Sequence, residues 1–209
     1  MSPFLIIVVA ICVLKNSVAV RIDVDTSQAR DLENLGKQIK STLERWYPYL
    51  SDQLYSSTYE DVQVIPLYFD PSYEGVAYAK GRRIVGAVDY YRKNSKDIGS
   101  MIHEMVHVIQ QYRGAPVWLG EGIADYYRYY HYEDRRLTKP TKDNKHTDGY
   151  GTTAFFLNWV DQNKQKIGGR SMIYWLNKDA REGKYTDNIW PKLLGQTVQQ
   201  VWQEMMQKA

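Results

Sequence analysis

Apolar residues recur along this chain in two patterns, one typical of helices and one typical of strands, and these patterns divide the chain into predicted elements. Spacings of three and four residues predict helices over 27–46, 97–111 and 117–130. Short apolar runs between turn residues predict strands over 22–24, 62–69, 76–80 and 83–88. After a polar loop at 134–149, further helices are predicted over 152–163, 171–180 and 198–207. Strands early and helices late indicate an α+β fold.

Turn and capping residues set the expected boundaries of these elements. Ser27 is suited to cap the first helix, and Pro48 to end it. Gly81 separates two short strands, which predicts a hairpin. No internal repeat or linker interrupts residues 20–209, so we expect one domain.

Residues 1–19 have the features of a signal peptide. An apolar run ends at Leu14, and Ser17 and Ala19 then place small residues three and one positions before a break. The run is too short to span a bilayer comfortably. We therefore expect cleavage after Ala19, a mature chain beginning at Val20, and a secreted, extracellular protein with no stable membrane anchor.

Composition narrows the possible chemistry. The only cysteine is Cys12, inside the predicted signal peptide, so the mature chain has neither a disulfide nor a thiol nucleophile. The formal net charge is only +3, with no concentrated basic patch, which argues against a nucleic-acid partner.

The strongest chemical signal is an H-E-x-x-H motif on the helix predicted over 97–111. His103 and His107 are four residues apart, so both imidazoles share one helix face and can reach one ion. Glu104 is rotated by about 100° from His103, so it can approach a zinc-bound water without being a ligand. In this arrangement the ion lowers the pKa of the water, and Glu104 is the catalytic base.

The next predicted helix supplies the ligand that a catalytic zinc site still needs. Glu121 and Asp125 also lie four residues apart. The break at 114–116 allows the two helices to fold back antiparallel, which brings Glu121 level with the histidines. We expect Glu121 as the third ligand, with one position left open for water. Asp125 is placed to accept the free N–H of a ligating histidine and fix its tautomer.

The sequence offers two alternatives for the third ligand. A three-histidine motif would need Gly at position 110 and His at 113, but the chain has Gln110 and Arg113. His131 and His146 are further candidates, each expected more often as a surface residue than as a ligand.

These motifs together resemble those of the basic secretory protein family of zincin-like metallopeptidases. The resemblance extends over nearly the whole mature chain, through segments 24–29, 76–88, 103–110, 114–116, 121–126, 149–154 and 194–198. It implies a zinc ion held by His103, His107 and Glu121, with Glu104 catalytic. It also implies a zincin-like architecture, with a small twisted N-terminal sheet, an active-site helix and a helical C-terminal half.

The resemblance also suggests how a substrate binds. In zincins the substrate backbone pairs with an edge strand above the active-site helix, and residues 83–88 resemble that strand. We expect an endopeptidase, because no acidic motif that would anchor a substrate amine precedes the H-E-x-x-H motif. The expected partner is a peptide or protein substrate, and the protein is expected to be a monomer.

A donor to the oxyanion of the tetrahedral intermediate is still needed. Tyr150 precedes a predicted helix and follows a polar loop, from which it could point into a cleft. It is our candidate, although a core or rim tyrosine among the 18 in the chain is the more ordinary interpretation. His146 and Tyr127 are the other candidates.

Two other functions remain open at this point. A secreted defence or binding protein could keep the fold with little catalysis, but it would not need Glu104. An enzyme that hydrolyses a non-peptide bond with the same metal is the third possibility.

Overall fold

The structure is a computed structural model that describes residues 19–209, so nearly all of the predicted signal peptide lies outside it. The strands are β1 (Arg21–Asp25), β2 (Val64–Asp70), β3 (Ala77–Lys80) and β4 (Arg83–Ala87). The helices are α1 (Glu33–Gln53), α2 (Val88–Lys93), α3 (Gly99–Gln110), α4 (Val117–Tyr126), α5 (Tyr150–Asn163), α6 (Met172–Arg181), α7 (Ile189–Leu194) and α8 (Val198–Lys208). Two shorter helical segments are η1 (Arg30–Leu32) and η2 (Tyr127–Tyr132). The α+β prediction is confirmed.

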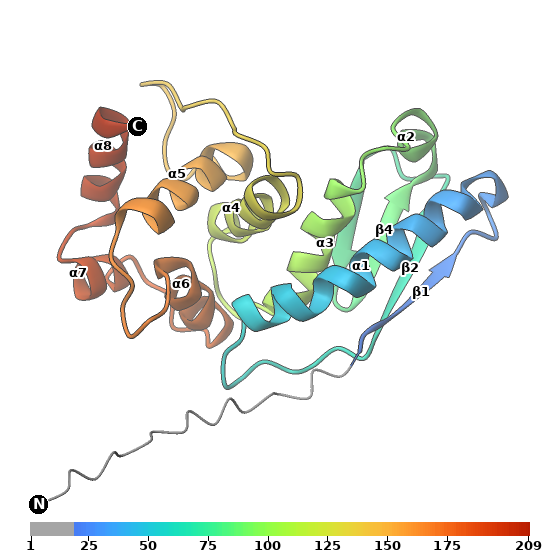
Figure 1. The fold of residues 1–209 in the computed structure, drawn as a ribbon, viewed down its shortest axis with the longest axis horizontal. Coiled ribbons are helices and arrows are strands. Elements are labelled where there is room, and N and C mark those ends of the chain that lie inside the picture. The colour runs from blue at the N-terminus through green and yellow to red at the C-terminus, as the bar shows by residue number, and fades with distance from the viewer. Residues whose placement is uncertain (1–18) are drawn as a thin grey trace, which may run out of the picture.

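The four strands form one sheet, in the order β1-β2-β4-β3. β1, β2 and β4 are parallel neighbours, while β3 and β4 form an antiparallel hairpin around Gly81, whose φ is 61°. Helices α1 and α3 pack against the sheet and against each other (Figure 1). The apolar side chains of Ile22, Ile65 and Ile84 are fully buried in this part of the core.

The prediction that residues 83–88 form the edge strand is wrong. β4 lies between β2 and β3, and Ile84 and Val85 on it are fully buried, as expected for an interior strand. The edge strands are β1 and β3, and the first three residues of β3 are only half-buried. Val88 does not end the strand but begins α2.

The first long helix is shifted towards the C-terminus from its predicted range. Ser27 does not cap it, because α1 begins only at Glu33, after η1. Ser27 lies in a turn instead, where its backbone N–H donates to the Asp25 carboxylate (2.8 Å). Pro48 does not end it, since α1 continues to Gln53. Tyr47 and Leu50, which flank Pro48, are buried in the core, and this packing offsets the backbone hydrogen bond that a proline removes.

The later helices follow the prediction more closely. The segment predicted over 117–130 is α-helical to Tyr126 and continues as the π-helical η2. The short helices α2 and α7 were not predicted, because each has only six residues and too few positions to show a period. None of the helices within residues 19–209 is long and apolar enough to cross a membrane.

Arg181 of α6 connects three parts of the fold. Its buried guanidinium donates hydrogen bonds to the backbone oxygens of Leu54, Ile109 and Gln110, and to the side chain of Ser56. These oxygens lie at the C-terminal ends of α1 and α3, where helices leave carbonyl groups unpaired. A positive charge from the helical half thus stabilises the end of the helix that carries the H-E-x-x-H motif.

Candidate metal centre

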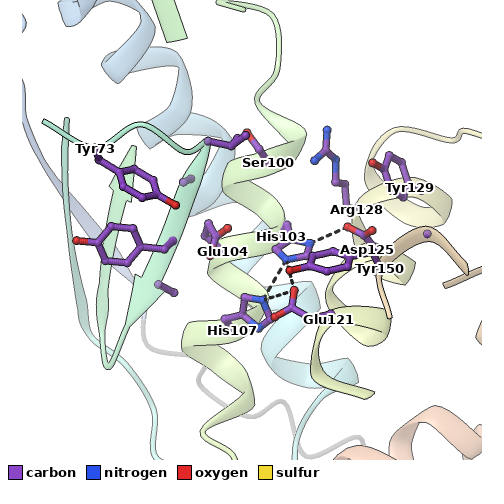
Figure 2. Close-up of a pocket in the computed structure, with 15 residues that line it drawn as sticks. Tyr73, Ser100, His103, Glu104, His107, Glu121, Asp125, Arg128, Tyr129 and Tyr150 are labelled. Atoms are coloured by element: carbon purple, nitrogen blue, oxygen red, sulfur yellow. Dashed lines mark hydrogen bonds and ion pairs between the residues drawn. The ribbon is translucent and has the colours of Figure 1, made fainter. Parts of the chain in front are cut away.

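Three potential ligand atoms meet between α3 and α4. His103 and His107 extend from one face of α3, and their Nε2 atoms are 3.0 Å apart (Figure 2). Glu121 of α4 places Oε2 at 3.1 Å from the Nε2 atom of His103 and at 3.4 Å from that of His107. Within residues 19–209, these three side chains form the one histidine and carboxylate group compact enough to hold a metal ion.

The turn between the two helices explains why Glu121 meets the histidines. α3 ends at Gln110 and is followed by Gln111, which takes a left-handed conformation with φ 48°. The Gln111 side chain is held by two hydrogen bonds with the backbone of Glu60, which stabilise this uncommon conformation. Pro116 then precedes the first residue of α4, and its fixed φ suits the start of a helix.

Both imidazoles are oriented through their other ring nitrogen. The Nδ1 atom of His103 lies 2.7 Å from an Asp125 carboxylate oxygen, and that of His107 lies 2.8 Å from the amide oxygen of Gln110. Gln110 in turn donates its N–H to the carbonyl of Gly120 (2.9 Å). Because Nδ1 is engaged in each ring, each Nε2 atom is left to face the shared centre.

The Gln110 contact was not predicted. In the sequence, Gln110 indicates only that the glycine of a three-histidine motif is absent. Its position three residues after His107, on the same helix face, was the available signal.

The three ligand positions have the spacing that zinc needs. A tetrahedral zinc ion with ligand distances of about 2.0–2.1 Å has ligand atoms about 3.3–3.4 Å apart. The observed separations of 3.0–3.4 Å lie close to this value. Two imidazoles and one carboxylate are also a donor set that zinc accepts in catalytic sites. The residues therefore fit a zinc ion.

Without a metal, the same contacts strongly perturb the protonation of the cluster. Burial alone would lower the pKa of His103, but hydrogen bonds to Asp125 and Glu121 outweigh it and raise that pKa to about 9. Burial would raise the pKa of Glu121, but hydrogen bonds from the two histidines lower it to about 2. A negatively charged carboxylate thus faces a positively charged imidazole, in the place where a cation would sit.

Glu104 lies beside this group without being part of it. Its side chain extends from α3 towards β3, and it is buried (Figure 2). Burial raises the pKa of Glu104, although the charges of the two histidines and a hydrogen bond from the backbone of Ala79 oppose that shift. Its carboxylate and the three ligand positions face one cavity of about 650 Å³.

The cavity is bounded by β3, α3, α4 and the start of α5. Tyr150 lines it, with its ring stacked on that of His103 at 6.3 Å between centroids. Tyr150 is 58% exposed and has φ 45°, a conformation that bulky residues rarely adopt. Such strain in an exposed aromatic residue is typical of functional sites.

The other sequence candidates lie outside this cavity. Tyr127 is buried in an aromatic cluster with Tyr126 and His131. The Nδ1 atom of His131 is hydrogen-bonded to the hydroxyl of Tyr49 (2.7 Å). His146 packs against Trp118, Phe156 and Trp202. None of these side chains lines the cavity or joins the ligand group of the described chain.

The structure adds residues to the cavity that the sequence did not single out. Tyr73 and Tyr78 pack edge to face along its β3 side, with ring centroids 4.9 Å apart. Arg128 lines the opposite end, where its guanidinium pairs with Asp97 (2.9 Å) and Glu133 (2.8 Å). These residues come from three separate segments, so no local pattern connects them.

Comparison with known proteins identifies the family. Over residues 21–205 the chain matches the family designated BSP and described as a peptidase of plants and bacteria. Neither the curated proteins nor the solved structures give a match. The match covers most of the chain and agrees with the resemblance found in its motifs. The chain therefore belongs to the basic secretory protein family, a family of peptidases of plants and bacteria.

Proposed function

We propose that this protein is a secreted zinc-dependent endopeptidase of zincin-like fold. The observation that carries the proposal is the three-donor group of His103, His107 and Glu121, which opens onto the same cavity as a buried carboxylate. Membership of a peptidase family supports a peptide or protein substrate.

His103, His107 and Glu121 would hold the ion, while Asp125 and Gln110 keep the two imidazoles in position. A bound zinc ion would supply Lewis-acid chemistry, which lowers the pKa of a water and polarises a carbonyl. The Glu104 carboxylate takes up the proton released by the attacking water and later transfers it to the leaving amine. Tyr150 lines the same cavity, which supports its hydroxyl as the donor of a hydrogen bond to the oxyanion that would form at the substrate carbonyl.

β3 is an edge strand of the sheet and forms one wall of the cavity. A substrate in extended conformation could pair with the outward-facing backbone groups of β3 other than the Ala79 N–H, which donates to Glu104, as in other complexes formed by strand addition. This assigns to residues 77–80 the part that the sequence had suggested for residues 83–88.

The decisive experiment combines metal analysis with a Glu104→Gln variant. The substitution keeps the shape of the side chain and all three ligands, so the zinc content should stay at one per chain. Cleavage of a peptide library should slow by about 10²–10⁴-fold, the usual contribution of a general base.

Other outcomes would favour the alternatives. Wild-type protein that binds zinc but cleaves no peptide would favour a binding protein, or an enzyme acting on a non-peptide bond. Native protein without metal would exclude the zinc mechanism, and full activity of Glu104→Gln would place the base elsewhere.

A further inference from the structure

A second cavity, of about 450 Å³, continues the cleft beyond His107. His107 lines both cavities, so the second one begins directly beside a proposed metal ligand. Its walls include the β3–β4 turn, with Arg82, and the chain after α3, with Arg113. A peptide paired with β3 and directed towards the β3–β4 turn would extend from the metal ligands into this cavity.

The charge of this second cavity is predominantly positive. Arg82, Arg113 and Arg181 line it, and Glu60 is the one carboxylate among its described lining residues. The guanidinium of Arg113 has no hydrogen-bonding or ion-pair partner within residues 19–209. Glu60 pairs with Arg82 at 3.0 Å, but both side chains are more than half exposed. Such an exposed pair is weak and can be exchanged for another carboxylate.

The end of α3 would ordinarily oppose an anion here, because the last carbonyls of a helix carry partial negative charge. Arg181 offsets the partial negative charge of these carbonyls. Its guanidinium donates to the carbonyls of Ile109 and Gln110, with no carboxylate among the groups that accept its hydrogen bonds. The positive charge of Arg181 is thus not cancelled by an ion pair, and the floor of the cavity stays favourable to an anion.

We propose that this cavity binds a carboxylate of the substrate near the scissile bond, with Arg113 and Arg82 as the specificity-determining residues. The proposal rests on the proposed peptidase function for its setting, but its test does not depend on catalysis. The carboxylate can belong to a Glu or Asp side chain or to the C-terminus of a peptide, and both present the same group to a guanidinium.

The test uses matched peptides that differ only in Glu or Gln at the positions flanking the cleaved bond. Their binding to Glu104→Gln protein is measured by fluorescence anisotropy, and their kcat/KM by cleavage with the wild type. A charge-assisted hydrogen bond should make the Glu peptide better by about 10- to 100-fold in both measurements. A second pair of peptides has no acidic side chains, and its members end in either a free carboxylate or an amide. Better binding of the free carboxylate would show that the cavity binds a peptide C-terminus.

Three variants assign the preference to the cavity. Arg113→Gln should bring the Glu-to-Gln ratio towards one and leave the Gln peptide unaffected. Glu60→Gln should raise the ratio, because it frees Arg82 and removes the competing carboxylate. Arg30→Gln is the control. It removes the same charge as Arg113→Gln but lies in η1, before the start of α1 and outside the cavity, so the ratio should not change.

Equal binding of the paired peptides, in both the side-chain and the C-terminal series, would overturn the proposal. So would an Arg113→Gln variant that weakens Glu and Gln peptides alike. A third outcome separates the two proposals. If the Glu peptide binds better than the Gln peptide but the wild type cleaves neither, the proposed function is refuted and the carboxylate site is retained.

Discussion

At the scale of single residues, each of the two proposed histidine ligands is held by a neighbour that the metal would not touch. Gln110 has the less obvious part, since it bridges His107 and the carbonyl of Gly120 and so couples the ligand to α4. Asp125 does the same for His103 from α4 itself. The precision of the site therefore depends on both helices.

Gln110→Leu should weaken zinc binding by about 10–100-fold, because His107 loses the partner that fixes its ring and tautomer. Competition with a chromogenic chelator measures this on folded protein, and Asp125→Asn should have an effect of similar size. Gln162→Leu is the control, because Gln162 is exposed on α5 and its side chain contacts Asn158, far from the histidines in the chain. An unchanged zinc affinity in Gln110→Leu would reduce that residue to a packing role.

Tyr150→Phe tests the proposed oxyanion donor. The ring that stacks on His103 is kept and only the hydroxyl is lost, so the zinc content should not change. If the hydroxyl stabilises the oxyanion, kcat should fall by about 10²–10³-fold with little change in KM. Tyr129→Phe, at another wall of the same cavity, should have no comparable effect. A variant with normal kcat would make Tyr150 a rim residue.

At the scale of elements, the helical half is held together by close approaches and by one charged cluster. A Cβ atom at Gly122 would clash with the side chain of Thr153, so glycine permits α4 and α5 to pack tightly beside Glu121. Further along, Glu204 of α8 accepts hydrogen bonds from Lys164 (2.6 Å), Lys208 (2.8 Å) and Gln196 (3.0 Å).

The Glu204 cluster predicts a pH dependence of stability. Hydrogen bonds from Lys164, Lys208 and Gln196 lower the pKa of Glu204 to about 2. A depressed pKa means that the folded state favours the charged carboxylate, so this contribution is complete above about pH 5 and is lost as pH falls towards 2. Glu204→Gln should therefore lower Tm at pH 7 and have little effect at pH 2. Thermal unfolding followed by circular dichroism at both values checks this, and an equal loss at the two pH values would contradict it.

At the scale of the whole molecule, the proposed centre lies at the junction of its two halves. α3 belongs to the sheet side and carries the histidines, whereas α4 and α5 belong to the helical side and contribute Glu121 and Tyr150 (Figure 1). A metal bound here would cross-link the halves. The chain has a single cysteine, so no intramolecular disulfide can perform that role.

Removal of the metal should therefore destabilise the entire fold. A ligand present at about 1,000 times its Kd adds about 4.1 kcal/mol to stability, and for this size each kcal/mol shifts Tm by about 2–4 °C. We expect a chelator to lower Tm by about 10 °C, measured by calorimetry, while a reducing agent leaves it unchanged. His107→Ala protein should start from the lower Tm and not respond to the chelator. A wild-type Tm that is insensitive to the chelator would contradict a tightly bound structural link.

The sequence by itself determined the fold class, the approximate helices and the residues that meet at the centre. It could do so because two residues four apart share a helix face whatever surrounds them, and because only residues 111–116 separate α3 from α4, which keeps the two pairs close in the chain. Local rules of this kind placed His103, His107, Glu121 and Asp125 before any tertiary contact was known.

Only the tertiary structure decided which strands form the edges of the sheet and that α1 continues through Pro48. It also decided that Gln110 and the arginine-lined cavity adjoin His107. Each depends on residues far apart in sequence. β4 is interior because it pairs with β2, and Pro48 is tolerated because of the core around Tyr47 and Leu50. Arg181 reaches α3 across 71 positions of chain. Strand pairing, burial and charge contacts between residues so far apart in sequence arise only in the packed molecule, so the periodicity of the sequence does not predict them.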